Sequence, residues 1–273
     1  MNNDEIVITR TADPVKSISK QTSYPTETID LPSKGYFYNS EDALSKGELE
    51  LKTMTAKEED ILTSPNLIKK GVVLDKLLES LIVTPGVNID NLLLCDKNAL
   101  FIAARRLAYG DSYGPLSIKC QKCGEESKHT INLGEIKEKE YNFDSVEKGK
   151  NLFQFTLPSS KKVIVFKLIN SKDESDIDKE LKITNKLLKS GGSSEITTRL
   201  KKVIVSIDGE TNRAIVNKFI DNDLLSKDSV ALRSYIKTIS PDLDMTFNFM
   251  CNNCNNEERM DVPMSVSFFW PES

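Results

Sequence analysis

The sequence predicts an α+β protein, with a helical N-terminal part followed by β-hairpins and closed by a zinc-ribbon-like site. Three observations support this fold class. Two Cys-x-x-Cys knuckles stand far apart in the chain, and apolar residues alternate on both sides of each knuckle. Apolar residues recur at helical spacing between residues 55 and 109, and they alternate again over residues 151–169.

The chain divides into three predicted parts. Residues 1–30 are rich in Ser, Thr, Lys and Asp, with few apolar residues apart from Ile6-Val7-Ile8, so we expect an extended arm that orders on a partner. Residues 31–140 form the helical part with the first knuckle. Residues 141–273 hold a hairpin, further helices, the second knuckle and an aromatic C-terminus. The charged stretch 134–150 is interpreted as the linker between these two parts.

The first half of the helical part begins with a turn and a strand. Residues 31–38 contain a Pro, a Gly and three aromatic residues, which predicts a turn feeding a strand. Residues 48–54 alternate as a half-buried strand does. Thr55 and Glu58 have the spacing of a capping box, so a helix should begin there.

Two further helical signals follow. Residues 67–83 have apolar residues at helical spacing, interrupted at Gly71. Asp96 is placed to cap a helix over residues 97–109, and Gly110 is placed to end it.

The third part repeats these signals in a different order. Residues 151–169 alternate around Pro158 and predict a hairpin. Ser171 and Glu174 form a second capping-box pattern. The remaining predicted elements are a helix from there to about residue 189, a helix and strand over 195–207, and a helix that starts at Ser226 or Asp228 and ends before Pro241.

The two knuckles consist of Cys120 with Cys123 and Cys251 with Cys254. A tetrahedral zinc ion needs four ligands and one knuckle supplies two, so we expect both pairs to hold one structural zinc ion per chain. Four thiolates can also bind iron, so iron is the alternative metal. Disulfides within each pair are the alternative, but nothing indicates secretion, and a thioredoxin-like motif would need a βαβ context. Gly124 supplies the left-handed residue that such turns favour.

Other candidate chemical groups are few. Cys95 lies in an apolar run and is predicted to be a buried thiol. His129 is the only histidine, and we expect an exposed strand residue because four cysteines already complete the metal shell. The sequence has no Gly-rich phosphate loop and no Gly-x-Ser-x-Gly motif. Four thiolates would leave zinc no position for water, so the sequence predicts a protein that is not an enzyme.

Composition restricts the class of partner. The net charge of -4 gives no support for binding a polyanion over a large surface. No apolar run approaches the roughly 20 residues that span a bilayer, and the N-terminus lacks a signal-peptide pattern. We therefore expect a cytoplasmic protein, at least when it is made, without a membrane partner.

Two aromatic clusters are candidate partner-binding groups. The first consists of Tyr36, Phe37 and Tyr38, and the second of Phe268, Phe269 and Trp270. Chain ends usually fray, so three aromatic residues near one end either pack into the protein's own core or dock into a neighbour.

Five segments in order along the chain carry a family resemblance: LPSKGYFY, LKTMTAKEEDILTSPNLIKKGVVLDKLLESLI, LLLCDKNALFIAARRLAYGDSYGPLSIKCQKCG, IDGETNRAIVNKFI and CNNCNNEERMDVPMSVSFFWP. Over residues 28–271 the chain resembles the baseplate hub proteins of T-even-type, contractile-tailed phages. The resemblance implies a role in building the hub beneath the tail tube, as a structural subunit or as an assembly factor. It implies binding to other baseplate, hub and tail proteins, in the host cytoplasm during assembly and, for a subunit, in the virion.

The same resemblance implies the four knuckle cysteines as metal ligands and no catalytic residues. The alternative function is a zinc-ribbon nucleic-acid binder, which normally carries a basic, aromatic face. Lys119, Lys122 and Lys128 are the local basic candidates. Four acidic residues stand beside them and weigh against nucleic acid as a partner: Glu125, Glu126, Glu257 and Glu258.

Overall fold

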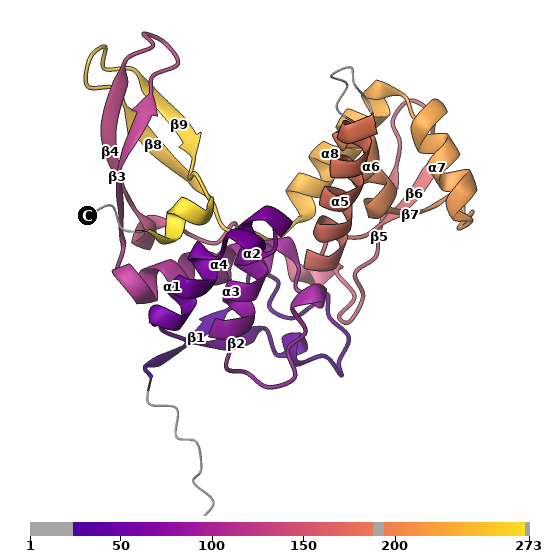
Figure 1. The fold of residues 1–273 in the computed structure, drawn as a ribbon. Coiled ribbons are helices and arrows are strands. Elements are labelled where there is room, and N and C mark those ends of the chain that lie inside the picture. The colour runs from indigo at the N-terminus through magenta and orange to yellow at the C-terminus, as the bar shows by residue number, and fades with distance from the viewer. Residues whose placement is uncertain (1–23, 188–193, 271–273) are drawn as a thin grey trace, which may run out of the picture.

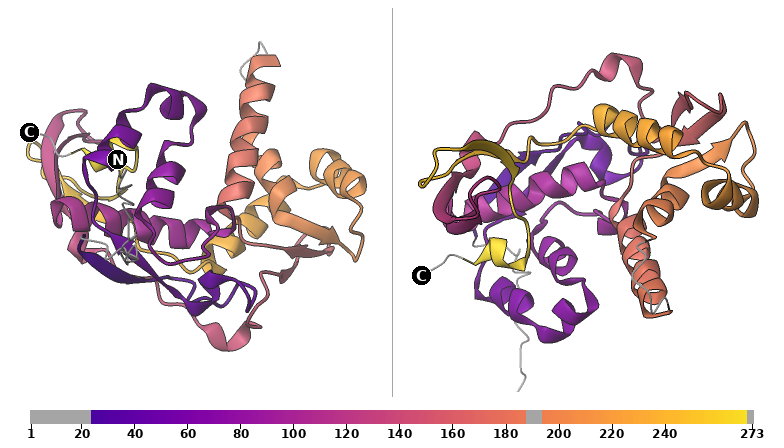
Figure 2. Two further views of the ribbon diagram at one scale, coloured as in Figure 1. Left: turned by 60° about the horizontal axis from the view of Figure 1, so that its bottom comes forward. Right: turned by 90° about the horizontal axis from the view of Figure 1, so that it is seen from above.

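The computed structural model describes residues 24–187 and 194–270, which form a central body with two arms (Figure 1). One arm consists of two β-hairpins, and the other consists of a small sheet covered by helices. Both further views keep the two arms apart (Figure 2). The described residues contain eight α-helices and small antiparallel sheets, so the predicted α+β class is confirmed. The predicted arm over residues 1–23, including Ile6-Val7-Ile8, lies outside the described residues.

The central body contains one two-stranded sheet and four α-helices. Its elements are β1 (Thr26–Asp30), β2 (Glu48–Lys52), α1 (Ala56–Thr63), α2 (Pro65–Lys70), α3 (Val73–Leu81) and α4 (Leu94–Tyr109). Single 3₁₀ turns lie at Ala43–Lys46, Ile89–Asn91, Leu133–Glu135 and Phe143–Ser145. β1 pairs antiparallel with β2, with Thr28 opposite Glu50. Residues 26–30, which the sequence assigned to the arm, are therefore part of the fold.

The local signals of the body are mostly confirmed. Leu49 and Leu51 of β2 are buried, as the alternation predicts. Thr55 and Glu58 form the predicted capping box at the start of α1. Gly71 has a positive φ of 76° and separates α2 from α3, because a left-handed residue ends a helix without a Cβ clash.

Asp96 has a different role from the predicted helix cap. Helix α4 begins at Leu94, so Asp96 lies inside its first turn. The carboxylate of Asp96 is fully buried and accepts hydrogen bonds from Ser33 N at 2.9 Å, Ser33 Oγ at 2.7 Å and the Tyr38 hydroxyl at 2.5 Å. It therefore fixes the turn over residues 31–38. That turn follows strand β1, whereas the sequence predicted a turn that leads into a strand.

The charged stretch 134–150 is part of the body, which corrects its interpretation as a linker. The rings of Tyr141 and Phe143 lie 4.5 Å apart, centroid to centroid, and both approach Phe37. Val146 also packs against the main core. Apolar residues scattered among the charges anchor this stretch, and a scan of overall charge does not detect such anchors.

The helical arm contains a three-stranded sheet and four helices. Its elements are β5 (Phe153–Thr156), β6 (Val163–Phe166), α5 (Ser171–Leu187), α6 (Glu195–Val203), β7 (Ile204–Ile207), α7 (Arg213–Asn222) and α8 (Ser226–Ile239). The strand order is β5-β6-β7, and both pairings are antiparallel. The predicted hairpin, the helix-strand pair over 195–207 and the start of the last helix at Ser226 agree with these bounds. The predicted helix end near residue 189 lies outside the described residues.

The capping box of α5 lies one residue earlier than predicted. Asn170 Oδ1 accepts from Asp173 N at 2.9 Å, and Asp173 Oδ2 accepts from Asn170 N at 3.4 Å. Glu174 instead binds Arg199 of α6 through both carboxylate oxygens, at 2.8 and 2.9 Å. The sequence pattern Asn-Ser-x-Asp-Glu permits both registers, and the pairing with Arg199 is visible only in three dimensions.

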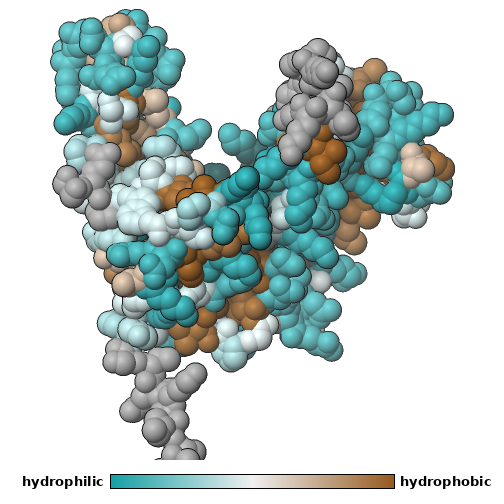
Figure 3. Space-filling view, in the orientation of Figure 1, coloured by the Kyte–Doolittle hydropathy of each residue, from teal (hydrophilic) through white to brown (hydrophobic). Residues whose placement is uncertain are grey.

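After α8 the chain returns to the central body. Leu243, Val262, Phe268 and Phe269 belong to the same apolar core as α3 and α4. A second core is formed by buried apolar side chains between Leu157 and Leu232. The predicted division after residue 140 therefore differs from the packing, in which the helical arm is an insertion between two parts of the body. On the face drawn in Figure 3, apolar side chains gather over the body between the arms.

Candidate metal centre

The hairpin arm brings together two segments that are distant in the sequence. Its strands are β3 (Ser112–Lys119), β4 (Glu126–Asn132), β8 (Thr246–Met250) and β9 (Glu257–Asp261). β3 pairs with β4 and β8 pairs with β9, both antiparallel. The turns of the two hairpins lie together at the end of the arm that is remote from the body (Figure 1). Each turn carries one Cys-x-x-Cys pair.

The first knuckle is closed by backbone hydrogen bonds. Cys120 N donates to Glu125 O at 2.9 Å, and Gly124 N donates to Cys120 O at 2.9 Å. Gly124 has a φ of 75°, as the sequence predicts for the residue after the second cysteine.

The second knuckle repeats this pattern. Cys251 N donates to Asn256 O at 2.9 Å, and Asn255 N donates to Cys251 O at 3.0 Å. Asn255 takes the left-handed conformation with a φ of 50°, which asparagine tolerates better than most residues. Asn255 was not among the residues predicted from the sequence, although its position after the second cysteine matches that of Gly124.

The four sulfur atoms form a compact cluster. Cys120 Sγ lies 3.7 Å from Cys254 Sγ, and Cys123 Sγ lies 3.6 Å from Cys251 Sγ. All four Sγ atoms lie within 4.8 Å of one another. A tetrahedral zinc ion with zinc–sulfur distances of about 2.3 Å requires sulfur–sulfur distances of about 3.8 Å. The cluster therefore has the size of a four-coordinate metal site, and each contact joins a cysteine of one knuckle to a cysteine of the other.

The apolar core around this cluster is small. Cys120, Phe249 and Cys251 are its buried members, and the partly buried residues that pack against them are Ile118, Phe247, Cys254 and Met260. Ser127 of β4 also lies in the contact, since its Oγ accepts from Asn252 N at 3.3 Å and is 3.9 Å from Cys251 Sγ. Sequence reasoning missed Ser127, a polar residue that is buried on β4 as Ile131 is.

Neighbouring groups shift the pKa of two thiols in opposite directions. Backbone N–H groups of Cys254 and Asn253 lower the pKa of Cys251 to about 6. The pKa of Cys254 is raised to about 12, because burial and the three neighbouring thiols outweigh the lowering effect of the Asn256 N–H. Four thiolates this close together repel one another, so a cation at the centre would be needed to keep all four deprotonated.

His129 and Cys95 lie apart from the sulfur cluster. His129 is on β4, as predicted, but it is half-buried and its ring stacks on Phe247 at 5.3 Å. This contact fills the space between the two hairpins, so the expectation of an exposed residue is wrong. Cys95 is buried at the start of α4, as predicted. Burial raises the pKa of its thiol, which makes it less reactive.

Most of the aromatic candidates for partner binding are buried in the core of the folded chain. Phe37 and Tyr38 are buried in the main core. Phe268 and Phe269 are also buried there, and their rings contact Tyr113 and Phe101 respectively. These four side chains stabilise the chain itself, because the turn over 31–38 and the C-terminal segment both fold onto the body.

Two of the six aromatic candidates reach the surface. Tyr36 is half-buried with its ring 4.5 Å from that of Phe143, and Trp270 is 36% exposed. A role for these two residues in partner binding stays a prediction.

Comparison with known families supplies the deciding observation. The family model described as "T4 bacteriophage base plate protein" matches residues 27–270. The chain belongs to this family. The match covers almost all the described residues, including both knuckles and the inserted helical arm. The resemblance found in the sequence is thereby confirmed at the level of a T4-type baseplate protein, which is a structural component of the phage tail.

Neither the curated proteins nor the solved structures gave a match to this baseplate protein. Within the described ranges, none of its helices is both long enough and apolar enough to cross a bilayer.

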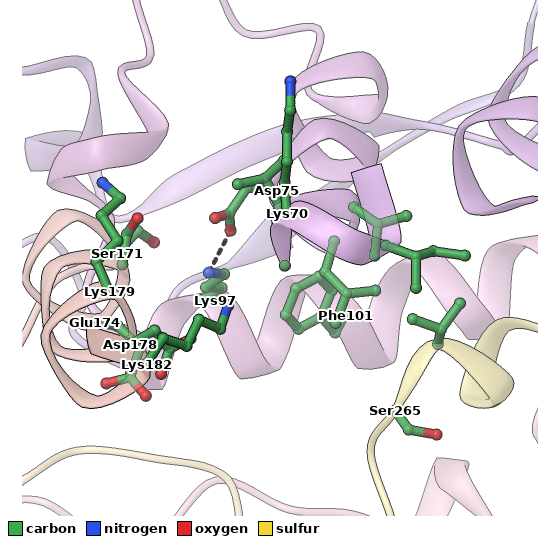
Figure 4. Close-up of a pocket in the computed structure, with 17 residues that line it drawn as sticks. Lys70, Asp75, Lys97, Phe101, Ser171, Glu174, Asp178, Lys179, Lys182 and Ser265 are labelled. Atoms are coloured by element: carbon green, nitrogen blue, oxygen red, sulfur yellow. Dashed lines mark ion pairs between the residues drawn. The ribbon is translucent and has the colours of Figure 1, made fainter. Parts of the chain in front are cut away.

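The baseplate protein also has a hollow of about 390 Å³ between α2–α3 and α5 (Figure 4). Phe101 of α4 forms part of the wall, and Asp75 forms an ion pair with Lys97 inside it. Glu174 lines the same hollow and is held by Arg199. The hollow marks the junction of the body with the helical arm, and these paired charges stabilise its walls.

Proposed function

We propose that this chain is a non-catalytic protein of the baseplate hub that binds other baseplate and tail proteins, and that its four knuckle cysteines hold one zinc ion. The observation that supports the hub role is the family match over residues 27–270. The observation that supports the metal is the contact between two knuckles 128 to 134 residues apart. Together they support the proposal of a tail protein whose hairpin arm is fixed by a structural metal.

Zinc is proposed because of the chemistry of the donors. Thiolates are soft ligands, and four of them in a tetrahedron suit zinc or an iron–sulfur site. Among the described residues, the side chains that cluster closely enough to hold a metal ion are these four cysteines. Zinc has no redox chemistry, and a full set of four protein ligands leaves no position for a reacting water. A structural role follows from this donor set.

The charge of the hairpin arm does not favour nucleic acid as the partner. Lys119 and Lys128 are exposed on β3 and β4, but Glu126 lies directly opposite Lys119, and Glu257 is a further acidic residue on β9 of the second hairpin. A nucleic-acid interface normally concentrates basic residues on one face.

The surface aromatic residues are the proposed contacts with other tail proteins. Trp270 is the more exposed of the two, and Trp is enriched among the residues that dominate interface energies. The Trp270→Ala variant should weaken association with the baseplate while leaving the metal site intact, since Trp270 is outside the sulfur cluster's core.

The test is to follow the chain through assembly. Purified virions and purified baseplate intermediates are each analysed by quantitative mass spectrometry for this protein. Presence in both identifies a structural subunit, presence only in the intermediates identifies an assembly factor, and presence in intermediates that contain the hub alone assigns the protein to the hub. Absence from both, with the protein abundant in the same infected cells, would contradict the proposed function.

A further inference from the structure

The groove beside strand β1 lies between two pieces of sheet. Its volume is about 420 Å³, and four consecutive residues of β1, from Glu27 to Asp30, form one wall. Ile136, Glu138 and Leu243 line the groove as well and are called the opposite wall below, and α4 contributes Ala99, Ile102 and Ala103 to the lining. β1 pairs with β2 alone among the described strands, so its other edge faces this groove.

The pairing of β1 with β2 determines which backbone groups face the groove. Leu31 N donates to Gly47 O at 2.8 Å and Thr53 N donates to Pro25 O at 3.0 Å, so odd-numbered residues of β1 point toward β2. On β2, Glu50 bonds away from β1, since its carbonyl accepts from Val83 N at 2.8 Å. Glu50 is opposite Thr28. Antiparallel pairs alternate, and the N–H and C=O of Thr28 therefore point into the groove.

The opposite wall also has a residue whose backbone N–H and C=O are not paired with a neighbouring described strand. Asp244 N donates to Lys137 O at 2.7 Å, and Lys139 N donates to Asp242 O at 2.8 Å. Glu138 lies between these two bonds, in an isolated antiparallel bridge with Leu243. Its own N–H and C=O therefore point away from Leu243, to the side of this bridge that is not paired with any described strand.

The two walls are linked at one end of the groove. Lys34 Nζ lies 2.9 Å from Glu138 Oε1 and 3.8 Å from Asp30 Oδ2. An extended segment lying between the walls would meet backbone donors and acceptors on both sides and would join the two pieces of sheet. Strand addition of this kind obtains its affinity from main-chain hydrogen bonds.

The charges around the groove indicate the chemistry of the segment. Four acidic residues line it: Glu27, Asp30, Asp111 and Glu138. Arg106 neutralises Asp111 at 2.6 Å, and the single ammonium of Lys34 is shared by Asp30 and Glu138. Negative charge remains in excess, which favours a segment with Lys or Arg at alternate positions.

We propose that a basic, extended segment of a neighbouring baseplate protein adds as a strand between β1 and residues 136–138. This inference rests on the proposed function, because it takes the partner from the same assembly. It adds the site on this chain and the mode of binding. The edge of β1 is the kind of unpaired strand edge that proteins otherwise cover or block.

The test compares hydrogen exchange and incorporation. Exchange of the Thr28 and Glu138 amides is measured in the isolated full-length chain and in purified baseplates. We expect these amides to exchange at least about tenfold more slowly in the baseplates, because strand pairing protects them. The Thr28→Pro variant removes the N–H that faces the groove without removing a bond to β2, so it should fold but be incorporated poorly. Thr28→Ala keeps the N–H and should be incorporated normally.

Two charge-reversal variants test whether the partner segment is basic. Glu27→Lys reverses a charge in the groove wall and should reduce incorporation, whereas Glu41→Lys makes the same change outside the groove and should not.

Three outcomes would overturn the inference. If the wild-type chain is incorporated while both amides exchange freely and Thr28→Pro has no effect, the groove is unused and the proposed function still stands. If the amides are protected in the isolated chain and lose protection when residues 1–23 are deleted, the occupant is the chain's own N-terminal segment. If the chain is absent from baseplates and virions, the proposed function fails and the inference fails with it.

Discussion

The two arms of this baseplate protein are stabilised in different ways. The helical arm has an apolar core of its own, in which Phe166, Ile164, Leu200 and Leu232 are almost completely buried. The core of the hairpin arm has three buried residues among those described, and two of them are cysteines. Burial of apolar surface can stabilise the first arm, whereas the second arm requires a bond between its hairpins.

This difference shows where a structural metal would add stability, namely where two small hairpins have almost no apolar core between them. The hairpins come from segments more than a hundred residues apart, and each is too small to be stable alone. A metal held by both knuckles would join them at the tips, while Phe268 and Phe269 fix the end of the second segment to the body.

The largest expected effect is on the hairpin arm when metal is removed. Apparent binding free energies of structural zinc are on the order of 10 kcal/mol at neutral pH, and at such sites this is folding free energy. We expect a chelator to increase hydrogen exchange in β3, β4, β8 and β9, while α5 and α8 stay protected. Exchange mass spectrometry with and without added zinc checks this. Equal loss of protection in both arms would show that the arms are not independently stabilised.

The converse variant is Phe166→Ala in the helical arm. Phe166 is fully buried and its ring stacks on Phe153 at 5.5 Å, so the cavity should cost about 3–5 kcal/mol. Denaturant unfolding followed by circular dichroism measures the loss. The metal content should be unchanged, and the exposed Ile183→Ala variant should show almost no effect. Loss of metal in Phe166→Ala would contradict the separation of the arms.

A smaller effect is expected from a buried carboxylate in the helical arm. Asp228 of α8 accepts hydrogen bonds from Ser159 N at 2.7 Å and Ser160 N at 3.0 Å, which fixes the β5–β6 turn. The Asp228→Asn variant replaces one acceptor with a donor and should cost about 1–3 kcal/mol. The same denaturant experiment checks it, with the exposed Asp223→Asn as the control. A free energy of unfolding within error of the wild type would remove Asp228 as an organiser of the turn.

A pH dependence of stability is expected in the body. Burial raises the pKa of Glu58, but hydrogen bonds from Lys52, Ser80 and Thr55 outweigh burial and lower the pKa to about 2. A depressed pKa in the folded state contributes stability above the ordinary carboxyl pKa, and this is lost as pH falls toward about 2.

We therefore expect the Glu58→Gln variant to show a shallower loss of stability than the wild type between about pH 4.5 and about pH 2. Thermal unfolding over this pH range is the measurement. Parallel curves for the two proteins would contradict the role of Glu58.

Much of the fold and of the candidate metal site could be predicted from local patterns. The capping box at Thr55, the break at Gly71 and the four cysteines are each defined by residues close together in sequence. The sequence could not show that Asp96, Glu58 and Asp228 bind groups on other segments, because the partners lie elsewhere in the chain. Each of these acids lies in the first turn of a helix, where a helix cap or a solvated charge was the simpler interpretation.

The aromatic residues show the same limit. Phe37 and Phe269 are aromatic, as interface residues often are. Phe37 lies in a turn and Phe269 near the last residues of the chain, yet both are buried in the body. Whether an aromatic side chain meets its own core or a partner depends on long-range packing. The groove beside β1 was also hidden from sequence analysis, since it is defined by backbone groups on two separate segments.

The most direct test of the shared metal site is the metal content per chain. Elemental mass spectrometry is performed on the purified full-length protein and on the Cys120→Ser and Cys251→Ser variants. We expect about one zinc per wild-type chain and equal loss in the two variants, because one ion takes ligands from both knuckles. No metal in the wild type, or retention of metal by either variant, would contradict the account.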